Sequence, residues 1–213
     1  MTKPSFSDEA AGILLDTNAV LINAKEPFTY TSGKKGPVYV DCRRLISFPK
    51  ARDRLMDMGA EMIRRECPGI EYVAGGETAG IPYAAFLADR LDLPMLYIRK
   101  KPKGFGRMSQ IEGFMEDTGK KVLIVEDVQN YGVSVKVFVD TLRAAEAVTE
   151  HIFVIFQHGH DSSKRSMKEM GVTLHALTDW QAVLKVAKAR KSFDTSTLAS
   201  VESFLHNPEG WAA

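Results

Sequence analysis

The spacing of hydrophobic and polar positions changes several times along the chain, and these changes predict the secondary structure. Apolar runs of strand length occupy residues 70–75, 94–99, 121–127, 150–157 and 172–179. Apolar residues recur at helical spacing over residues 49–67, 79–92, 133–147, 162–171, 180–190 and 197–206. Apolar strands alternating with amphipathic helices predict an α/β fold, with a central parallel sheet covered by helices on both faces.

The N-terminal part has a different pattern. Helical spacing of Ala11, Ile13, Leu14, Val20 and Leu21 predicts an opening helix over residues 7–25. The stretch "FTYTSGKKGPVYVD" (28–41) predicts two short extended pieces around a turn at Ser32 and Gly33. Without a linker or repeat, we expect a single domain over residues 1–213.

Composition narrows the class of protein. With 213 residues and 45% hydrophobic residues, the chain can bury a sizeable core, and its net charge of +1 excludes a general nucleic-acid binder. The two cysteines, Cys42 and Cys67, have no metal-ligand spacing and provide no disulfide framework. No segment is typical of a signal peptide or a membrane span. We therefore expect a cytoplasmic protein that binds neither nucleic acid nor membrane.

Candidate chemistry first appears in "VEDVQNYGVS" (125–134), where a buried strand meets a helix. Backbone N–H groups at a helix start favour an anion such as phosphate, and Gly132 lets the chain bend. The adjacent carboxylates of Glu126 and Asp127 could accept hydrogen bonds from a ribose diol. A plain turn capped by Ser134 explains the same residues, so both interpretations stay open at this point. The stretch is not a P-loop, and "GGETAG" (75–80) is not a dinucleotide fingerprint.

Further blocks carry a family resemblance. "VLIVEDV" followed by "GVS" resembles the ribose-phosphate motif of the type I phosphoribosyltransferases. "FTYTSGKKGPVYVDCRRL", "GGETAGIPYAAFLADRLDLPM" and "YIRKKPKGFGRMSQIEG" are similar to successive blocks of orotate phosphoribosyltransferase, in that family's order. The resemblance covers roughly residues 10–150. It implies the phosphoribosyltransferase fold, with residues 1–45 forming a hood over the base site.

The resemblance also implies a reaction and its partners. Phosphoribosyl pyrophosphate (PRPP) would transfer its ribose phosphate to orotate, giving orotidine 5′-monophosphate and pyrophosphate in pyrimidine synthesis. Mg²⁺ would accompany PRPP, held mainly by PRPP and water, so no side chain is named as a metal ligand. Members of the family are dimers in which a mobile loop reaches into the neighbouring subunit's site.

The resemblance assigns roles to particular residues. The residues implied as catalytic are Lys103, Glu126 and Asp127. Those implied to bind PRPP through its pyrophosphate are Arg99, Lys100, Lys103, Thr78 and Ala79. The ribose-phosphate loop would comprise Glu126, Asp127, Val128, Gln129, Asn130, Tyr131, Gly132, Val133 and Ser134. Orotate would contact Tyr39, Val40 and Asn130. Clustered cations suit a pyrophosphate leaving group, although such a cluster is more often a solvated basic loop.

This sequence departs from the family pattern at three places. Asn130 and Val133 occupy positions where the family often has hydroxyl residues that bond the phosphate, and Tyr131 is unusually bulky. Phe105, between Gly104 and Gly106, replaces a histidine of the pyrophosphate loop, which leaves the loop's charge to Lys103. After the fourth strand, His158 and His160 stand where many members have an arginine for the orotate carboxylate. They could replace it or be two exposed loop residues.

These departures keep three functional hypotheses open. The first is an active orotate phosphoribosyltransferase. The second is a related transferase for another nucleobase. The third is a non-catalytic paralogue that binds a nucleotide or phosphoribosyl compound.

Overall fold

The computed structural model describes residues 5–30, 33–102, 110–208 and 210–211. The chain divides into two compact units. We call Met1–Phe48 with Thr178–Ala213 the terminal unit, and Pro49–Leu177 the central unit. Each unit is described by itself, and the expectation of one domain stays a prediction.

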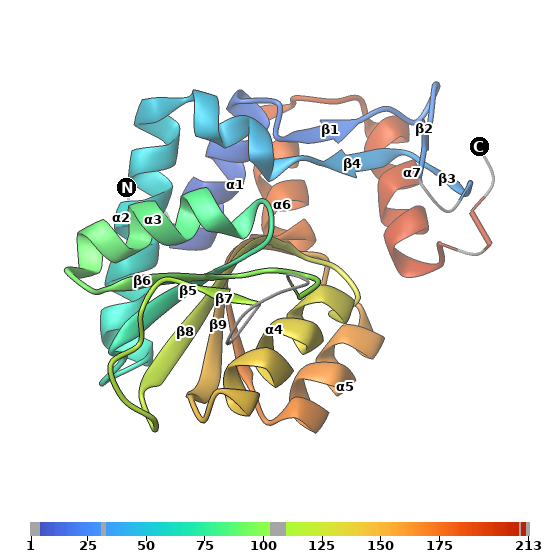
Figure 1. The fold of residues 1–213 in the computed structure, drawn as a ribbon. Coiled ribbons are helices and arrows are strands. Elements are labelled where there is room, and N and C mark those ends of the chain that lie inside the picture. Colours follow the sequence, from blue (N-terminus) through green and yellow to red (C-terminus); the bar gives the residue numbers. More distant parts are fainter. Residues whose placement is uncertain (1–4, 31–32, 103–109, 209, 212–213) are drawn as a thin grey trace. The chain divides into compact units, whose positions relative to one another are not determined.

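The central unit is built on a six-stranded sheet in the order β10-β9-β8-β5-β6-β7 (Figure 1). Its strands are β5 (Tyr72–Gly76), β6 (Met95–Ile98), β7 (Ile111–Glu112), β8 (Lys121–Gln129), β9 (Val148–Gln157) and β10 (Thr173–Asp179), whose last two residues belong to the terminal unit. The neighbours β6, β5, β8 and β9 run parallel, which confirms the predicted parallel centre. Only β7, two residues long and antiparallel to β6, has no counterpart in the prediction.

Helices cover both faces of this sheet, as predicted. They are α2 (Pro49–Glu66), α3 (Gly80–Leu91), α4 (Val133–Ala144) and α5 (Asp161–Met170). Alternate strand residues such as Val122 and Ile124 share a buried cluster with Phe138 of α4 and Met167 of α5. On the other face, Phe153 lies against α2 at Gly59. Because successive strand residues point to opposite faces, strands covered on both sides must be apolar throughout.

The terminal unit corrects the predicted opening helix. Its elements are α1 (Phe6–Asp16), β1 (Val20–Ile22), β2 (Phe28–Thr29), β3 (Lys35–Gly36), β4 (Val38–Val40), the 3₁₀ helix η1 (Cys42–Ser47), α6 (Trp180–Arg190) and α7 (Thr195–His206). The helix ends at Asp16, and the cap Thr17 bonds back to the last turn. Val20 and Leu21 lie in a strand that pairs with β4, so their helical spacing was coincidental. The predicted extended pieces are confirmed as the β2–β3 pair and β4.

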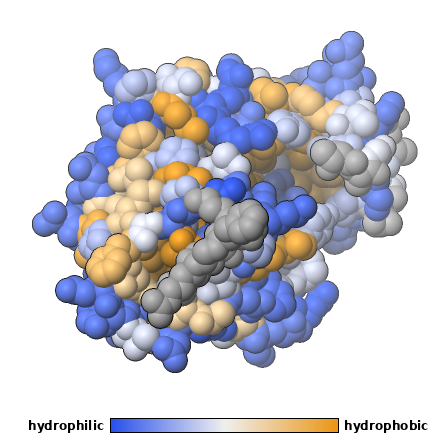
Figure 2. Space-filling view, viewed as in Figure 1, coloured by the Kyte–Doolittle hydropathy of each residue, from blue (hydrophilic) through white to orange (hydrophobic). Residues whose placement is uncertain are grey.

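The hydropathy of the helices and of the surface bears on the expectations from the sequence. No helix in the described ranges is long and apolar enough to cross a bilayer. On the face drawn in Figure 2, hydrophilic and apolar side chains are interspersed. Two of the most exposed large apolar side chains are Tyr131 at 59% and Val133 at 76%, and both belong to the predicted ribose-phosphate loop.

Candidate active site

The "GGETAG" segment connects the end of β5 to the start of α3. Ala79 is the N-cap of α3, and the exposed Thr78 precedes it, after a cis peptide bond from Glu77. A helix start generally suits an anion, although here the Ile81 N–H donates to the Thr78 carbonyl at 3.4 Å and Pro82 has no N–H. The structure thus places Thr78 and Ala79 directly before the start of α3, and their role in binding pyrophosphate stays a prediction.

Two cations follow the neighbouring strand β6. The Arg99 N–H donates to the Gln110 carbonyl, the Gln110 side-chain amide donates to the Arg99 carbonyl, and the Arg99 guanidinium lies 3.7 Å from Glu112. Its Nε is buried and has no hydrogen-bond partner among the residues that the structure describes. The Lys100 side chain is exposed, and its backbone N–H donates to the Glu77 carboxylate at 2.8 Å. That bond ties the ends of β5 and β6 together, a role for Glu77 that the sequence did not indicate.

The paired carboxylates lie on β8, one strand further along the sheet. We expected the strand to end at Asp127. It continues to Gln129, so Glu126 and Asp127 lie within the strand and the turn begins at Asn130. Glu126 is 8% exposed, and burial followed by the Asp127 charge raises its pKa to about 8. The positive charge of Lys100 lowers that pKa, which indicates that Lys100 lies close enough to Glu126 to act on it electrostatically. Asp127 is half-buried.

The turn after β8 leads directly into α4. Gly132 adopts φ 88° as the N-cap of α4, a backbone conformation that favours glycine. The helix begins at Val133, so Ser134 lies inside the first turn and is not the N-cap that the sequence suggested. Asn130 is exposed. The exposed helix start is a suitable anion site, as the phosphate interpretation requires.

The two histidines after β9 are not the exposed loop residues that one interpretation allowed. Both are half-buried and stack with their rings 5.6 Å apart. His160 also stacks on Tyr131 at 4.7 Å. Burial, with a smaller effect from His160, lowers the pKa of His158 to about 4, and burial lowers the pKa of His160. Tyr131 thus has a structural explanation, because its ring stacks on His160, which in turn stacks on His158.

The two remaining candidates for orotate binding lie in the terminal unit. Tyr39 and Val40 are half-buried in β4, opposite Leu21 and Val20 of β1. Hydrogen bonds from Asp41 to Ala19 and from Asn23 to Pro37 flank this pairing. Because ladder bonds alternate in an antiparallel pair, the backbone of Val40 points away from β1, whereas that of Tyr39 is used in the ladder. The Tyr39 ring packs on Phe28, with ring centroids 5.8 Å apart.

The carboxyl ends of parallel strands therefore assemble most of the predicted site within the central unit. This edge brings together Thr78, Ala79, Arg99, Lys100 and the loop from Glu126 to Ser134. Tyr39 and Val40 belong to the other unit, and Lys103 and Phe105 lie outside the described residues. Ligands in sheets of this type bind at the carboxyl ends of the strands.

Comparison with known proteins agrees with this geometry. Residues 67–189 match the family model of the phosphoribosyl transferase domain. An orotate phosphoribosyltransferase of Agrobacterium fabrum is 48% identical over 206 residues, covering 95% of this chain and 88% of that protein. One from Dinoroseobacter shibae is 47% identical, covering 99% of this chain and 97% of that protein. The crystal structure of an orotate phosphoribosyltransferase from Aeropyrum pernix superposes with a TM-score of 0.68 at 28% identity, covering 83% of this chain and 97% of that one.

Proposed function

Because this chain belongs to the orotate phosphoribosyltransferase family, we propose that it transfers ribose 5-phosphate from PRPP to orotate. The products are orotidine 5′-monophosphate and pyrophosphate, and the reaction serves pyrimidine biosynthesis. The observation that carries the proposal is the meeting of two helix starts, two cations and two carboxylates at one sheet edge. Such a site matches a ligand that has a phosphate at one end, a diol in the middle and a pyrophosphate at the other.

In the proposed reaction, the bond between the sugar C1 and the pyrophosphate oxygen breaks, and C1 bonds to a ring nitrogen of orotate. Pyrophosphate leaves with the bonding electron pair and takes up, directly or through water, the proton that the ring nitrogen loses. Arg99 and Lys100 hold the departing charge. The backbone N–H groups at Thr78 and Ala79 hold the same group. The sequence resemblance indicates that Lys103 adds further positive charge beside the pyrophosphate.

The residues of β8 hold the sugar in this proposal. Asp127 accepts hydrogen bonds from the ribose hydroxyls and offsets positive charge at C1. Glu126 carries its proton through most of the neutral range and can donate a hydrogen bond to a hydroxyl. The loop from Val128 to Ser134 binds the 5-phosphate, mainly through backbone N–H groups at the start of α4.

Mg²⁺ fits this edge because PRPP oxygens and water are the hard donors that it prefers, and the nearby carboxylates of β8 favour a cation without needing to ligate it. When bound, the ion neutralises part of the pyrophosphate charge. We assign it to PRPP oxygens and water, and to no side chain of this chain.

Orotate is read by the Val40 backbone, by the Asn130 amide and by Tyr39. At pH 7, His158 can supply only a neutral hydrogen bond to the orotate carboxylate, because its pKa lies near 4. A neutral donor is weaker than an arginine. We therefore expect orotate affinity to owe less to this contact than it does where an arginine is present.

The decisive experiment is a turnover assay with purified protein, orotate, PRPP and Mg²⁺. We expect orotate absorbance to fall only when PRPP is present, with stoichiometric release of pyrophosphate. Turnover of another nucleobase but not of orotate would favour the altered-specificity alternative. PRPP binding without any turnover would favour the non-catalytic one.

The enzyme is proposed to act as a homodimer, in which the segment around Lys103 serves the neighbouring subunit's site.

A further inference from the structure

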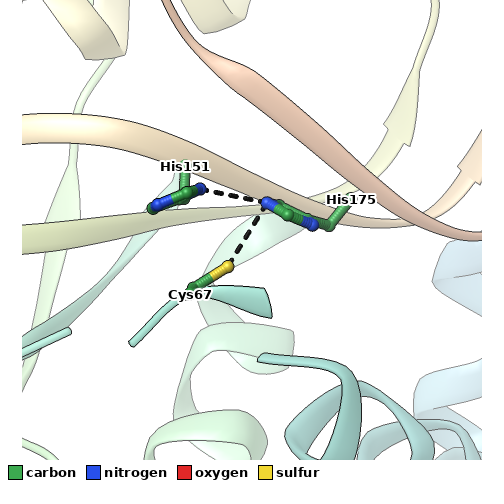
Figure 3. A group of neighbouring side chains, drawn as sticks. All are labelled: Cys67, His151 and His175. Atoms are coloured by element: carbon green, nitrogen blue, oxygen red, sulfur yellow. Dashed lines mark hydrogen bonds between the residues drawn. The ribbon is translucent and has the colours of Figure 1, made fainter. Parts of the chain in front are cut away.

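Three potential metal ligands from distant parts of the sequence meet inside the central unit. Cys67 directly follows α2, His151 lies near the start of β9 and His175 near the start of β10 (Figure 3). This is the amino-terminal end of the strands, whereas the candidate active site occupies their carboxyl ends. The cluster is therefore separate from the transfer site.

His175 stands at the centre of the cluster. Its Nε2 lies 3.3 Å from Cys67 Sγ and 3.0 Å from His151 Nδ1, and all three atoms lie within 4.8 Å of one another. Cys67 is 2% exposed and His175 is 7% exposed, while His151 is half-buried. Cys67 Sγ and His151 Nδ1 both lie beside His175 Nε2, and the three residues come from the end of α2, from β9 and from β10 (Figure 3).

These separations are close to those of a zinc site. Ordinary Zn–S and Zn–N bond lengths at tetrahedral angles place sulfur and nitrogen ligands about 3.6 Å apart and two nitrogens about 3.3 Å apart. The two measured separations are 3.3 Å and 3.0 Å. Opening by a few tenths of an ångström would admit the ion.

A carboxylate already orients the central ligand. His175 Nδ1 lies 3.0 Å from Glu66 Oε2, and the other oxygen of Glu66 accepts a hydrogen bond from Arg65 at 2.7 Å. With the Nδ1 proton donated to Glu66, the Nε2 lone pair faces the cysteine and the second histidine. A histidine held by a carboxylate on its far nitrogen is the usual arrangement around protein-bound zinc.

We propose that Cys67, His151 and His175 bind one divalent transition-metal ion of the zinc class, with Glu66 as a positioning residue. One thiolate and two imidazoles suit zinc and cobalt and do not suit magnesium or calcium. Three protein ligands leave a fourth tetrahedral position for water, on the side where His151 reaches solvent. The ion would join α2, β9 and β10 at the amino ends of the strands.

A reactive cysteine is a weaker explanation for the same group. Burial, followed by the Glu66 charge, raises the pKa of the Cys67 thiol to about 11. A nucleophilic cysteine needs the opposite shift, whereas a bound divalent ion itself deprotonates a coordinating thiol. The other alternative is a metal-free chain of hydrogen bonds that only stabilises the fold, and metal titration distinguishes it from the proposal.

The test is titration of the full, metal-depleted protein with Co²⁺. We expect one ion per chain, visible bands of a four-coordinate site and a near-ultraviolet thiolate-to-cobalt charge-transfer band. Zn²⁺ should abolish these signals by displacement and raise the melting temperature. Failure of this test would leave the proposed transfer reaction intact, because PRPP turnover is measured separately.

Matched variants locate the site. Cys67→Ser should lose the charge-transfer band, whereas Cys42→Ser, which changes the other buried cysteine, should keep it. His151→Asn changes a half-buried ligand and should lower cobalt affinity at least about tenfold, while His206→Asn, at an exposed position of α7, should not. Glu66→Ala should weaken binding about 10- to 100-fold with the band retained.

Two results with the thiolate band would overturn the proposal, and a third result would come from His151→Asn. One is the absence of a thiolate band in the correctly folded wild-type protein at saturating Co²⁺. The other is a band that persists in Cys67→Ser. Cobalt binding that survives His151→Asn unchanged and lacks a thiolate signal would indicate the histidine pair 158 and 160 instead, which also contradicts the proposal.

Discussion

Glu126 and Asp127 are neighbours on β8, but their surroundings give them different properties. Glu126 is 8% exposed beneath the loop, and its pKa is raised to about 8, while Asp127 is only half-buried. Two equal charges this close in a buried place would repel, and holding a proton on Glu126 avoids that cost. The pair therefore provides one hydrogen-bond donor and one charged acceptor for a ribose.

The raised pKa of Glu126 predicts how stability changes with pH. Between the unfolded pKa near 4.5 and the folded value near 8, the native state binds one more proton than the unfolded state. Stability from this group is thus complete at low pH and is lost as pH rises towards 8. The free energy of unfolding of Glu126→Gln, relative to that of wild type, should rise by about 3 kcal/mol between pH 5 and pH 8. Urea unfolding at both pH values measures this, and equal changes in the two proteins would contradict it.

Val133 is the position in the proposed phosphate loop where a substitution is most expected to strengthen PRPP binding. It is 76% exposed at the first position of α4, so Val133→Thr adds a hydroxyl at little structural cost. A hydrogen bond to a charged group contributes about 1.5–3 kcal/mol, and the lower value is worth about tenfold in affinity. We expect Val133→Thr to lower the KM for PRPP about tenfold.

The control for this gain is Val148→Thr, a partly exposed valine at the start of β9. It should leave the KM for PRPP unchanged. If the KM of Val133→Thr for PRPP is unchanged or raised, a hydroxyl at this position does not contribute to phosphate binding in this protein.

At the scale of elements, the glycines of "GGETAG" are explained by packing as much as by the ligand. A Cβ on Gly75 would lie 2.7 Å from Ile81 Cα, and one on Gly80 would overlap the Val125 carbonyl. A Cβ on Gly76 would overlap the Glu126 carboxylate and the Phe138 ring. The three glycines allow β5 and α3 to approach β8, which brings the pyrophosphate segment close to the paired acids.

Gly76→Ala tests this link between packing and chemistry. The Phe138 ring is fully buried and cannot move aside, so Glu126 must shift. We expect a loss of about 2–3 kcal/mol in stability and a clear fall in kcat. Gly171→Ala serves as control, because it meets open space at φ 64° and should cost about 1 kcal/mol without affecting kcat. Normal kcat in folded Gly76→Ala would separate the packing from the site.

Periodicity predicted the elements well where they were long and buried on both sides. The central strands and helices appear as expected because their apolar patterns extend over many residues. The opening helix was extended too far, since Val20 and Leu21 fit a helix locally but pair with β4. The two-residue β7 is too short to produce a pattern. Ser134 was misplaced as a cap because a glycine at positive φ can begin the helix without a capping side chain.

At the scale of the whole molecule, some juxtapositions depend on the fold and leave no local signal. In the terminal unit, α1 packs on α6, with ion pairs from Asp16 to Arg190 at 2.8 Å and from Asp8 to Lys185 at 2.6 Å. A helical pattern shows that a face is buried but does not identify its partner. The Cys67–His151–His175 cluster was missed for the same reason, because its members are too far apart in sequence to form a motif.

The proposed sharing of sites between subunits predicts complementation in a dimer. If Lys103 acts in the neighbouring site and Asp127 in its own, Lys103→Ala and Asp127→Asn damage the same site from two different subunits. Each variant alone should have little activity, since one removes a cation at the leaving group and the other a charge at the sugar. In a mixed dimer one site carries both lesions, and the other keeps both native residues.

With free subunit exchange, half of the dimers are mixed and one of their two sites is intact, so about a quarter of wild-type activity should return. The control mixes Asp127→Asn with the Asp127→Asn, Lys103→Ala double variant, which has no intact site in any pairing and should gain nothing. Exchange is verified by native mass spectrometry. If mixed dimers form without a gain in activity, Lys103 serves the site of its own subunit, and each site is complete within one chain.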